Sequence, residues 1–319
     1  MAYFILRRLL ALIPTLLIAS IIVFSVVRFV PGDVLDLMLQ EVAFGTTAPE
    51  TRAALEAELG LDKPVHVQYI DWLTGVFRGD LGQSLWRNTS VTAEIGDRAV
   101  ISVQLTLWAM LFGLIIAAPV GIYSAIRQET GLDYLGRGFS ILALSVPNFW
   151  VGTLVVILPA IWWGWTPTSR IVPFLESPLQ NMQAYLIPAL VLGTSLSGAV
   201  MRMVRTMMLE TLRQDYIRTA WAKGLRERTV VLKHAVKNAM IPVLTLIGLL
   251  VPSLFSGSIV VEQIFRLPGM GELLLESVNT RDYPIIVGLF LVTAVVVVLV
   301  NLVVDLCYGL LDPKVRQDG

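Results

Sequence analysis

Residues 284–308 read PIIVGLFLVTAVVVVLVNLVVDLCY, an almost unbroken apolar run in which Asp305 is the only charged residue. The hydrocarbon core of a bilayer is ~30 Å thick, and a helix needs about 20 predominantly apolar residues to cross it. Residues 284–308 exceed that length. A backbone inside lipid must pair its polar groups internally, so the stretch is predicted to be a transmembrane helix.

Five further apolar runs lead to the same prediction for the rest of the chain. The 319 residues are 55% hydrophobic and 15% charged, whereas about 25% charged residues are usual in soluble domains. Mean hydropathy is +0.73. We therefore expect an all-α integral membrane protein, a single transmembrane domain over residues 1–319, with spans near 9–30, 100–123, 139–163, 184–204, 239–261 and 284–308.

Composition and motifs argue against several functional classes. The net charge is zero, which gives no reason to expect a nucleic-acid partner. The one cysteine, Cys307, cannot form an internal disulfide, and His66 and His234 each lack a second ligand at helical spacing, so no metal site is expected. The sequence contains no phosphate-binding GxxxxGK[ST], and no GxSxG or HExxH motif. No catalytic residue is predicted, and an enzyme is disfavoured.

Lysine and arginine orient the chain, because loops on the cytoplasmic side of a membrane carry an excess of both. With both termini in the cytoplasm, the inner segments hold fifteen Lys and Arg and the outer segments hold eight. Five of those eight lie in the long first loop, where the rule has least weight. We therefore expect cytoplasmic termini. The first run exceeds the about 7–15 apolar residues of a signal peptide, so we interpret it as an uncleaved span.

The long first loop, residues 31–99, is predicted to be an extracytoplasmic insert. It holds eleven acidic and five basic residues. The segment PETRAALEAELGL (49–61) has the charge and stop preferences of an amphipathic helix, with Glu50 near its start and Gly60 near its end. The insert is either a lid or docking surface or a solvated connection between two spans, and the sequence favours neither.

The segment between the fourth and fifth spans, residues 205–238, is the most basic inner loop. Two short helices fit it, near 205–222 and 227–237, with Gly224 placed to end the first. An apolar stripe is predicted along the first helix, opposite Arg213 and Lys223, through Leu209, Leu212, Tyr216 and Ala220. One interpretation is a basic amphipathic loop that rests on anionic lipid. The order of the residues favours another.

That order resembles the cytoplasmic loop of ATP-binding-cassette (ABC) importer permeases, in the version typical of the peptide/nickel family that carries dipeptides and oligopeptides. The residues that match the family pattern are Asp215-Tyr216-Ile217-Arg218-Thr219-Ala220, Ala222-Lys223-Gly224-Leu225, His234-Ala235, Asn238-Ala239 and Ile241-Pro242. Arg218 replaces the glutamate of the general ABC loop motif, so no contact is carried over from that glutamate. FRLPGMG (265–271) and LDPKVR (311–316) extend the resemblance over nearly the whole chain, which is similar to the first, B-type permease subunit.

The resemblance implies a type I ABC importer permease in a bacterial or archaeal cytoplasmic membrane, forming half of a translocation pore. The partners it implies are a second, homologous permease, two cytoplasmic ATPases and an extracytoplasmic substrate-binding protein. ATP and Mg²⁺ would be bound by the ATPases, leaving no cofactor on this chain. The coupling residues would be Asp215, Tyr216, Arg218, Thr219, Ala220, Ala222, Lys223 and Gly224. Dipeptides, longer peptides, glutathione, nickel chelates and opine- or sugar-like solutes all remain open as substrates.

Polar residues in or beside the predicted spans are candidates for the pore lining. These are Asn148, Ser195, Ser197, Ser256 and Ser258. Serine hydroxyls in membranes also bond between helices, so a purely structural role is the alternative. A secondary transporter or channel would likewise explain six spans, without any partner. A membrane enzyme lacks a candidate nucleophile–base pair.

Overall fold

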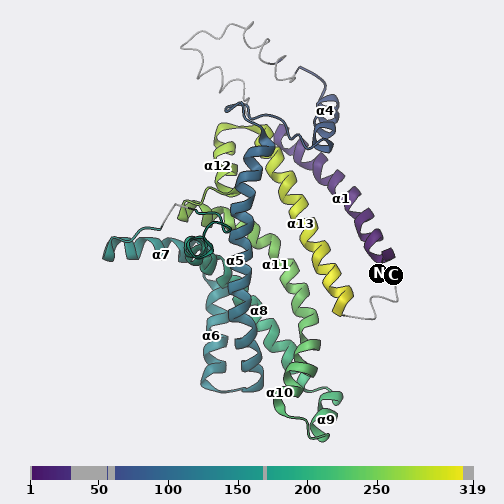
Figure 1. Cartoon of the computed structure of the whole chain (residues 1–319), viewed down its shortest axis with the longest axis vertical. Helices are drawn as coiled ribbons and strands as arrows, with labels where there is room; N and C mark the ends of the chain where they lie inside the picture. Colours follow the sequence, from purple (N-terminus) through teal and green to yellow (C-terminus); the bar gives the residue numbers. More distant parts are fainter. Residues whose placement is uncertain (1, 30–55, 57–61, 168–170, 312–319) are drawn as a thin grey trace. The chain divides into compact units, whose positions relative to one another are not determined.

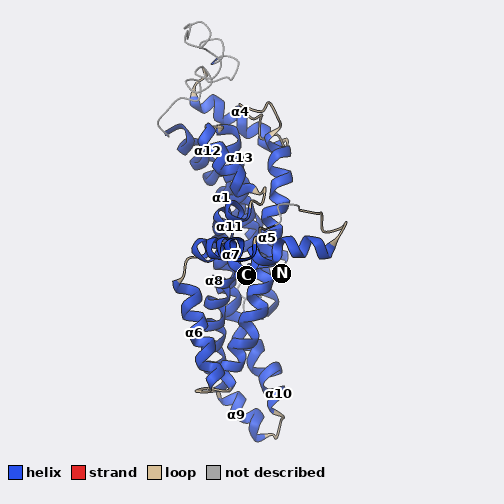
Figure 2. Ribbon diagram, turned by 90° about the vertical axis from the view of Figure 1, so that its left-hand side faces the viewer, coloured by secondary structure: helices blue, strands red, loops and turns tan. Residues whose placement is uncertain are grey.

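The computed structural model describes residues 2–29, 56, 62–167 and 171–311, and the described residues form helices joined by loops, with no strand among them (Figure 2). The helix predicted over 49–61 and most of the 31–99 insert lie outside the described residues. The chain divides into two compact units. Unit 1 comprises Met1–Leu6, Ile101–Pro268 and Leu299–Gly319, and unit 2 comprises Arg7–Val100 and Gly269–Val298.

Unit 1 is a bundle of long helices (Figure 1). It contains most of α5 (Val91–Ile126), then α6 (Gly131–Ser145), α7 (Asn148–Trp163), α8 (Pro178–Leu212), α9 (Asp215–Ala222), α10 (Glu227–Thr229), a π-helical turn η1 (Val230–Ala235) and α11 (Val236–Phe265). In its most apolar window α8 is 67% buried, against 28% for α5 and 33% for the α10–α11 helix. The apolar core therefore forms around α8, with Leu192, Val200 and Val204 fully buried on one face.

Backbones in unit 1 approach closely where glycine removes the side chain. A methyl group built on Gly193 of α8 would lie 2.5 Å from the carbonyl oxygen of Ala109 on α5. One on Gly121 of α5 would lie 2.8 Å from the carbonyl oxygen of Met201 on α8. Lipid supplies no hydrophobic driving force between helices, so small residues that allow close van der Waals contact hold membrane helices together.

The third predicted span, 139–163, is not one straight helix. α6 ends at Ser145, α7 begins at Asn148, and the two axes meet at 97°. Val146 is extended (φ −96°, ψ 124°) because the ring of Pro147 disfavours a helical residue before it, and Pro147 has no N–H to continue the ladder. Hydropathy predicts one span over residues 139–163, but Pro147 divides it into two helices.

Unit 2 contains most of α1 (Ala2–Phe29), α4 (Val65–Phe77), α12 (Met270–Thr280) and most of α13 (Tyr283–Leu311). Aromatic rings join α1 to α4: Phe24 lies 5.3 Å from Tyr69 and 5.5 Å from Trp72 between ring centroids. Ser20 and Tyr69 share a hydrogen bond of 2.8 Å. Ring pairs of this geometry stabilise a contact beyond the area that they bury.

Among the described residues, four helices are long and apolar enough to cross a membrane, and five are if the bent pair α6–α7 counts as one span. The four are α5, α8, the continuous helix Glu227–Phe265 and Tyr283–Val304 of α13. A shorter apolar helix, Leu10–Ser25, lies within α1. The prediction of a helical membrane protein is confirmed at this level.

Candidate functional site

The basic segment after α8 folds as three short pieces, which differ from the two predicted helices. α8 continues to Leu212, and Gln214 is extended (φ −71°, ψ 149°) before α9 starts at Asp215. The helix predicted over 205–222 is therefore wrong, because it spans this break. Leu209 and Leu212 belong to α8, while Tyr216 and Ala220 belong to α9, so the predicted stripe does not lie on one helix.

The second predicted helix, 227–237, is also not a separate element. α10, the π-helical turn η1 and α11 follow one another without a break. A π-turn inserts one extra residue per turn, and such insertions are frequent at functional positions in helices. The segment therefore runs directly into the long apolar helix that follows it.

α9 is held to unit 1 by a small apolar face. Ile217 is fully buried and Ala220 is 7% exposed, and both belong to the core of unit 1. The other face is open: the Arg218 and Asp215 side chains are 74% and 92% exposed and form an ion pair of 2.8 Å. Exposed pairs of this kind contribute little to stability. Ile217 is therefore the anchor of α9, while the charged face of the helix is exposed.

Gly224 closes α9 in the way the sequence predicts. Its φ of +72° is left-handed, its N–H donates to Trp221 O at 2.9 Å, and the Leu225 N–H donates to Ala220 O at 3.4 Å. This pair of bonds is the Schellman ending of a helix. A methyl group on Gly224 would meet nothing within 4 Å, so the constraint lies in the backbone conformation rather than in space.

A hydrogen bond joins α9 to the start of α11. Asn238 Nδ2 donates to Tyr216 Oη at 2.8 Å and to His234 O at 3.1 Å. Both Asn238 and Tyr216 are residues that match the family pattern, but nothing in the sequence indicated that they contact each other. Figure 1 shows α9 and α10 together at the end of the α8–α11 pair. The coupling residues predicted from the resemblance thus share one compact loop, built on Ile217, Gly224 and this amide.

The turn between α5 and α6 reaches both sides of this loop, which the sequence did not predict. Asp133, fully buried in the first turn of α6, accepts two hydrogen bonds from Arg205 of α8, at 2.8 Å from Nε and 3.0 Å from Nη2. Arg127 lies 3.4 Å from Glu227 of α10. The sequence feature that indicates where α6 begins is a helix cap. The Thr130 side chain accepts a hydrogen bond from the N–H of Asp133.

The five candidate pore residues occupy different environments. Asn148 Nδ2 donates to Ser195 Oγ at 3.2 Å, which joins α7 to α8. Ser197 and Ser258 are buried and donate to carbonyl oxygens of their own helices, at 2.6 and 2.7 Å. Ser256 is exposed. Unit 1 also contains a pocket of about 260 Å³, which none of the five candidate pore residues lines. Its lining residues are Trp165, Thr166, Pro167, Gln183, Ala184, Ile187, Pro188, Phe265 and Leu267.

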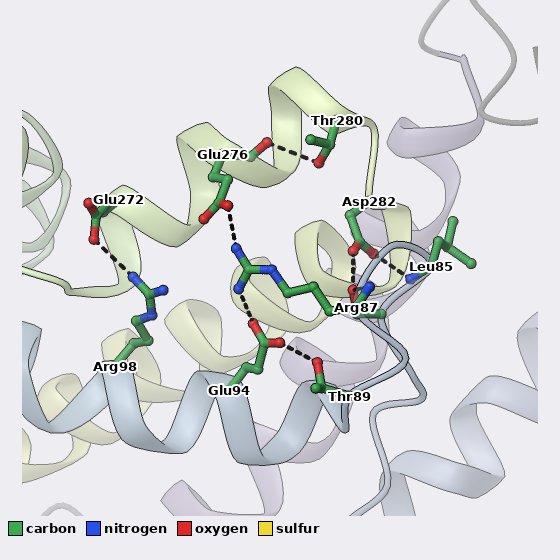
Figure 3. A network of polar contacts seen from close by, with 10 residues as sticks. Leu85, Arg87, Thr89, Glu94, Arg98, Glu272, Glu276, Thr280 and Asp282 are labelled. Atoms are coloured by element: carbon green, nitrogen blue, oxygen red, sulfur yellow. Dashed lines mark hydrogen bonds and ion pairs between the residues drawn. The ribbon is translucent and has the colours of Figure 1, made fainter. Parts of the chain in front are cut away.

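In unit 2 a polar network ties the segment before α5 to α12 (Figure 3). Arg87 pairs with Glu94 at 2.7 Å and also with Glu276, and Arg98 lies 2.9 Å from Glu272. The hydrogen bond to Glu276, together with the charge of both carboxylates, raises the pKa of Arg87 above its ordinary value against the opposing effect of burial. These contacts favour the charged form of the Arg87 guanidinium.

Asp282 completes this network at the start of α13. Its carboxylate accepts from Ser84 Oγ at 2.5 Å and from the Leu85 N–H at 3.3 Å, and Trp86 Nε1 donates to Thr280 O at 2.7 Å. Asp282 is 2% exposed.

No group of three or more potential metal ligands occurs among the described residues.

Long apolar helices packed around α8, with a short helix at one end, form a helical membrane protein. Residues 117–317 match the family described as "Binding-protein-dependent transport system inner membrane component", and residues 1–106 match "Binding-prot-dependent transport system membrane comp, N-term". The chain belongs to this family, and it is a permease subunit of an ABC importer. The family resemblance carried by the loop between α8 and α11 is thereby confirmed.

Two relatives match over nearly their whole length. The dipeptide transport system permease protein DppB of Escherichia coli K12 is 38% identical over 340 residues, which cover 99% of both chains. The glutathione transport system permease protein GsiC of Salmonella typhimurium is 38% identical over 316 residues, again 99% of both chains. These relatives are transport subunits and not enzymes.

A solved structure shares the fold. The crystal structure of an amino acid ABC transporter with histidines matches with a TM-score of 0.53 and 13% sequence identity, over 68% of this chain and 94% of that one. At this identity the match concerns the fold alone, and it supports the type I permease architecture.

Proposed function

We propose that the chain forms half of the translocation pore of an ATP-driven importer for peptides or related small solutes, and that it couples to cytoplasmic ATPases by alternating access. The names of the two relatives, a dipeptide permease and a glutathione permease, support this substrate class. The observation that carries the coupling role is α9, a short helix anchored by Ile217 with its charged face exposed.

α9 has the properties of a helix that docks in a groove. Trp221 is 44% exposed and Leu225 is 38% exposed, so apolar anchors stand beside the basic side chains of Arg218 and Lys223. Helix-in-groove recognition uses apolar anchors for affinity, and charges at the rim supply orientation. ATP shifts the importer between two states only if it binds them with different affinity, and in this proposal the loop transmits that bias to the permease.

The complete importer in this proposal contains a second, homologous permease, two ABC ATPases and an extracytoplasmic binding protein. ATP and Mg²⁺ are bound by the ATPases, and this chain holds no cofactor. The binding protein contacts the outer surface formed by residues 31–99 and 262–283. The network of Arg87, Glu276 and Asp282 supports that assignment, because it joins described parts of the two segments within unit 2.

The proposed topology has six spans with both termini in the cytoplasm of a bacterium or archaeon. The spans are α1, α5, the bent pair α6–α7, α8, α11 and α13. The basic residues of the loop between α8 and α11 support this orientation, because cytoplasmic loops are enriched in Lys and Arg.

Site-specific cross-linking tests the docking of α9. In a chain whose Cys307 is replaced by Ser, Trp221→Cys carries a photoactivatable cross-linker, and Leu175→Cys in the 95%-exposed position before α8 is the matched control. We expect the importer purified through a tag on this chain to yield a cross-link from position 221 to an ATPase subunit and none from position 175.

Two outcomes would contradict the proposal. An assembled importer that gives no cross-link from position 221 would remove the docking role. Peptide uptake by vesicles that contain only this chain would identify a secondary transporter or channel instead, since an ABC importer needs its ATPases for uptake. Competition by unlabelled di- and tripeptides against the transported probe measures the substrate class.

A further inference from the structure

The buried ion pair of Asp133 and Arg205 lies beside the coupling loop but is not part of it. Asp133 is fully buried, and Arg205 holds it through two parallel hydrogen bonds of 2.8 and 3.0 Å. The Glu129 N–H adds a third at 3.1 Å. Two parallel bonds between guanidinium and carboxylate fix orientation as well as distance. The pair is therefore a directional joint between α6 and α8.

The position of this joint connects the loop to the α5–α6 hairpin. Arg205 is on α8, seven residues before α8 ends at Leu212 and the chain turns into α9. On the return side, Arg127 in the α5–α6 turn pairs with Glu227 of α10. The turn thus contacts the chain both before and after α9. The Arg127–Glu227 pair is exposed at both ends and contributes less than the buried pair.

A second contact joins α6 and α8 farther from the loop. A methyl group on Gly198 of α8 would lie 3.0 Å from the carbonyl oxygen of Ser140 on α6, and Ser140 Oγ donates to Gly198 O at 2.6 Å. The Ser140 bond joins neutral groups, whereas hydrogen bonds between charged groups are about twice as strong. The ion pair is therefore the stronger directional contact between α6 and α8, and the one nearer to the loop.

We propose that Asp133 and Arg205 are positioning residues that transmit displacement of the coupling loop to the α5–α6 hairpin and, through the bend at Pro147, to α7. If α9 docks on an ATPase as proposed above, ATP moves α8, and the joint makes α6 follow. Neither residue touches a transported solute or ATP. Without this ion pair, α8 slides along α6, and the α5–α6 hairpin no longer moves when the ATPases bind ATP.

Two fluorescent reporters separate movement of the loop from movement of the hairpin. In the Cys307→Ser background, an environment-sensitive fluorophore is placed at Arg213→Cys at the end of α8 or at Leu135→Cys on α6. Both positions are exposed, and Leu135 is 70% exposed. The purified importer is measured with and without ATP plus vanadate. We expect both reporters to respond when the Asp133–Arg205 pair is intact.

The variant that tests the joint is the double substitution Asp133→Asn with Arg205→Gln. Removing Arg205 alone leaves the buried Asp133 carboxylate with only Arg137, at 4.0 Å, as a charged partner and risks misfolding, whereas removing both charges is milder. We expect the response at position 213 to be retained and the response at position 135 to fall by about five-fold or more, the range of typical coupling between sites. Uptake per ATP hydrolysed falls with it.

Two further variants complete the experiment. Arg205→Lys keeps the charge but loses the two parallel bonds, so we expect a partial response at position 135. Arg202→Gln removes an exposed arginine three residues earlier on α8 and is the matched control, which retains both responses.

The remaining outcomes overturn the proposal. Normal responses at both positions in the double variant would show that α6 follows α8 without the pair. Loss of both responses would assign the pair to holding the loop in shape for docking rather than to transmission. If neither reporter responds while the Asp133–Arg205 pair is intact, the proposed coupling to the ATPases is contradicted, and so is the proposed role of the ion pair. That result is distinct from the first two, because it appears before any substitution in the pair.

Discussion

Gly224 shows how one backbone dihedral angle determines the end of a short helix. The residue closes α9 at φ +72°, in open space, with the Gly224 and Leu225 N–H groups bonded back to Trp221 and Ala220. The left-handed conformation costs an L-residue free energy through steric clashes of its side chain, and the cost is largest for β-branched residues. The requirement at this position is therefore conformational and independent of side-chain size.

Replacing Gly224 by Val is expected to impair coupling without preventing membrane insertion. The left-handed position costs a β-branched residue about 1–3 kcal/mol, which loosens the end of α9. Gly224→Asn is the matched control, because Asn tolerates this conformation. Uptake and ATP hydrolysis measured on the same preparation test this. Equal uptake in the Val and Asn variants would show that the dihedral angle of Gly224 is unimportant for coupling.

At the scale of helices, close backbone contact brings α8 against α5. Gly193 faces the Ala109 carbonyl, and Gly121 faces the Met201 carbonyl, so each helix contributes a glycine to the contact. Such contacts tolerate no added volume, because the opposing atoms belong to backbone that cannot rotate away.

Gly193→Ala is expected to weaken the α5–α8 contact. Its methyl group would lie 2.5 Å from a carbonyl oxygen, and overpacking of this kind typically costs about 1–3 kcal/mol. Gly96→Ala, on α5 where an added methyl meets nothing within 4 Å, is the control and should be neutral or stabilising. Thermal denaturation of the purified importer measures the difference. Identical transition temperatures for the two variants would contradict the role of Gly193.

Hydropathy predicted the long helices well and their interruptions poorly. Each of the apolar runs 100–123, 184–204, 239–261 and 284–308 lies within one long helix, because burial in lipid requires only apolar length. The breaks at Pro147 and Gln214 depend on local dihedral angles inside continuous patterns. The pairing of Asp133 with Arg205 joins residues 72 apart in the sequence, and only the packed helices bring them together.

At the scale of the whole chain, the distribution of charge predicts how the protein sits in its membrane. The segment between Arg202 and Lys237 holds nine basic residues, far more than any other inner segment. Moving so many charges across a bilayer is strongly unfavourable during insertion. The α5–α6 turn, α9 and both termini are therefore expected on the cytoplasmic side.

Cysteine labelling from outside tests this orientation. In the Cys307→Ser background, a membrane-impermeant maleimide added to spheroplasts should label Asp62→Cys before α4 and leave Gln128→Cys in the α5–α6 turn unlabelled. Both positions are exposed, so accessibility to the reagent depends on the side of the membrane. Permeabilised cells, in which both should react, provide the control. Labelling of Gln128→Cys alone in intact spheroplasts would reverse the topology.

The glycine contacts between α5 and α8 also limit how this sequence can change over time. Every substitution of glycine adds at least one carbon, so Gly193 and Gly121 have no smaller or equal replacement to drift toward. Ala109 and Met201 contribute carbonyl oxygens to these contacts, and every amino acid carries that group. Substitution at the two glycines should therefore be rare among related chains, whereas the opposing carbonyl oxygens are present whichever residues occupy positions 109 and 201.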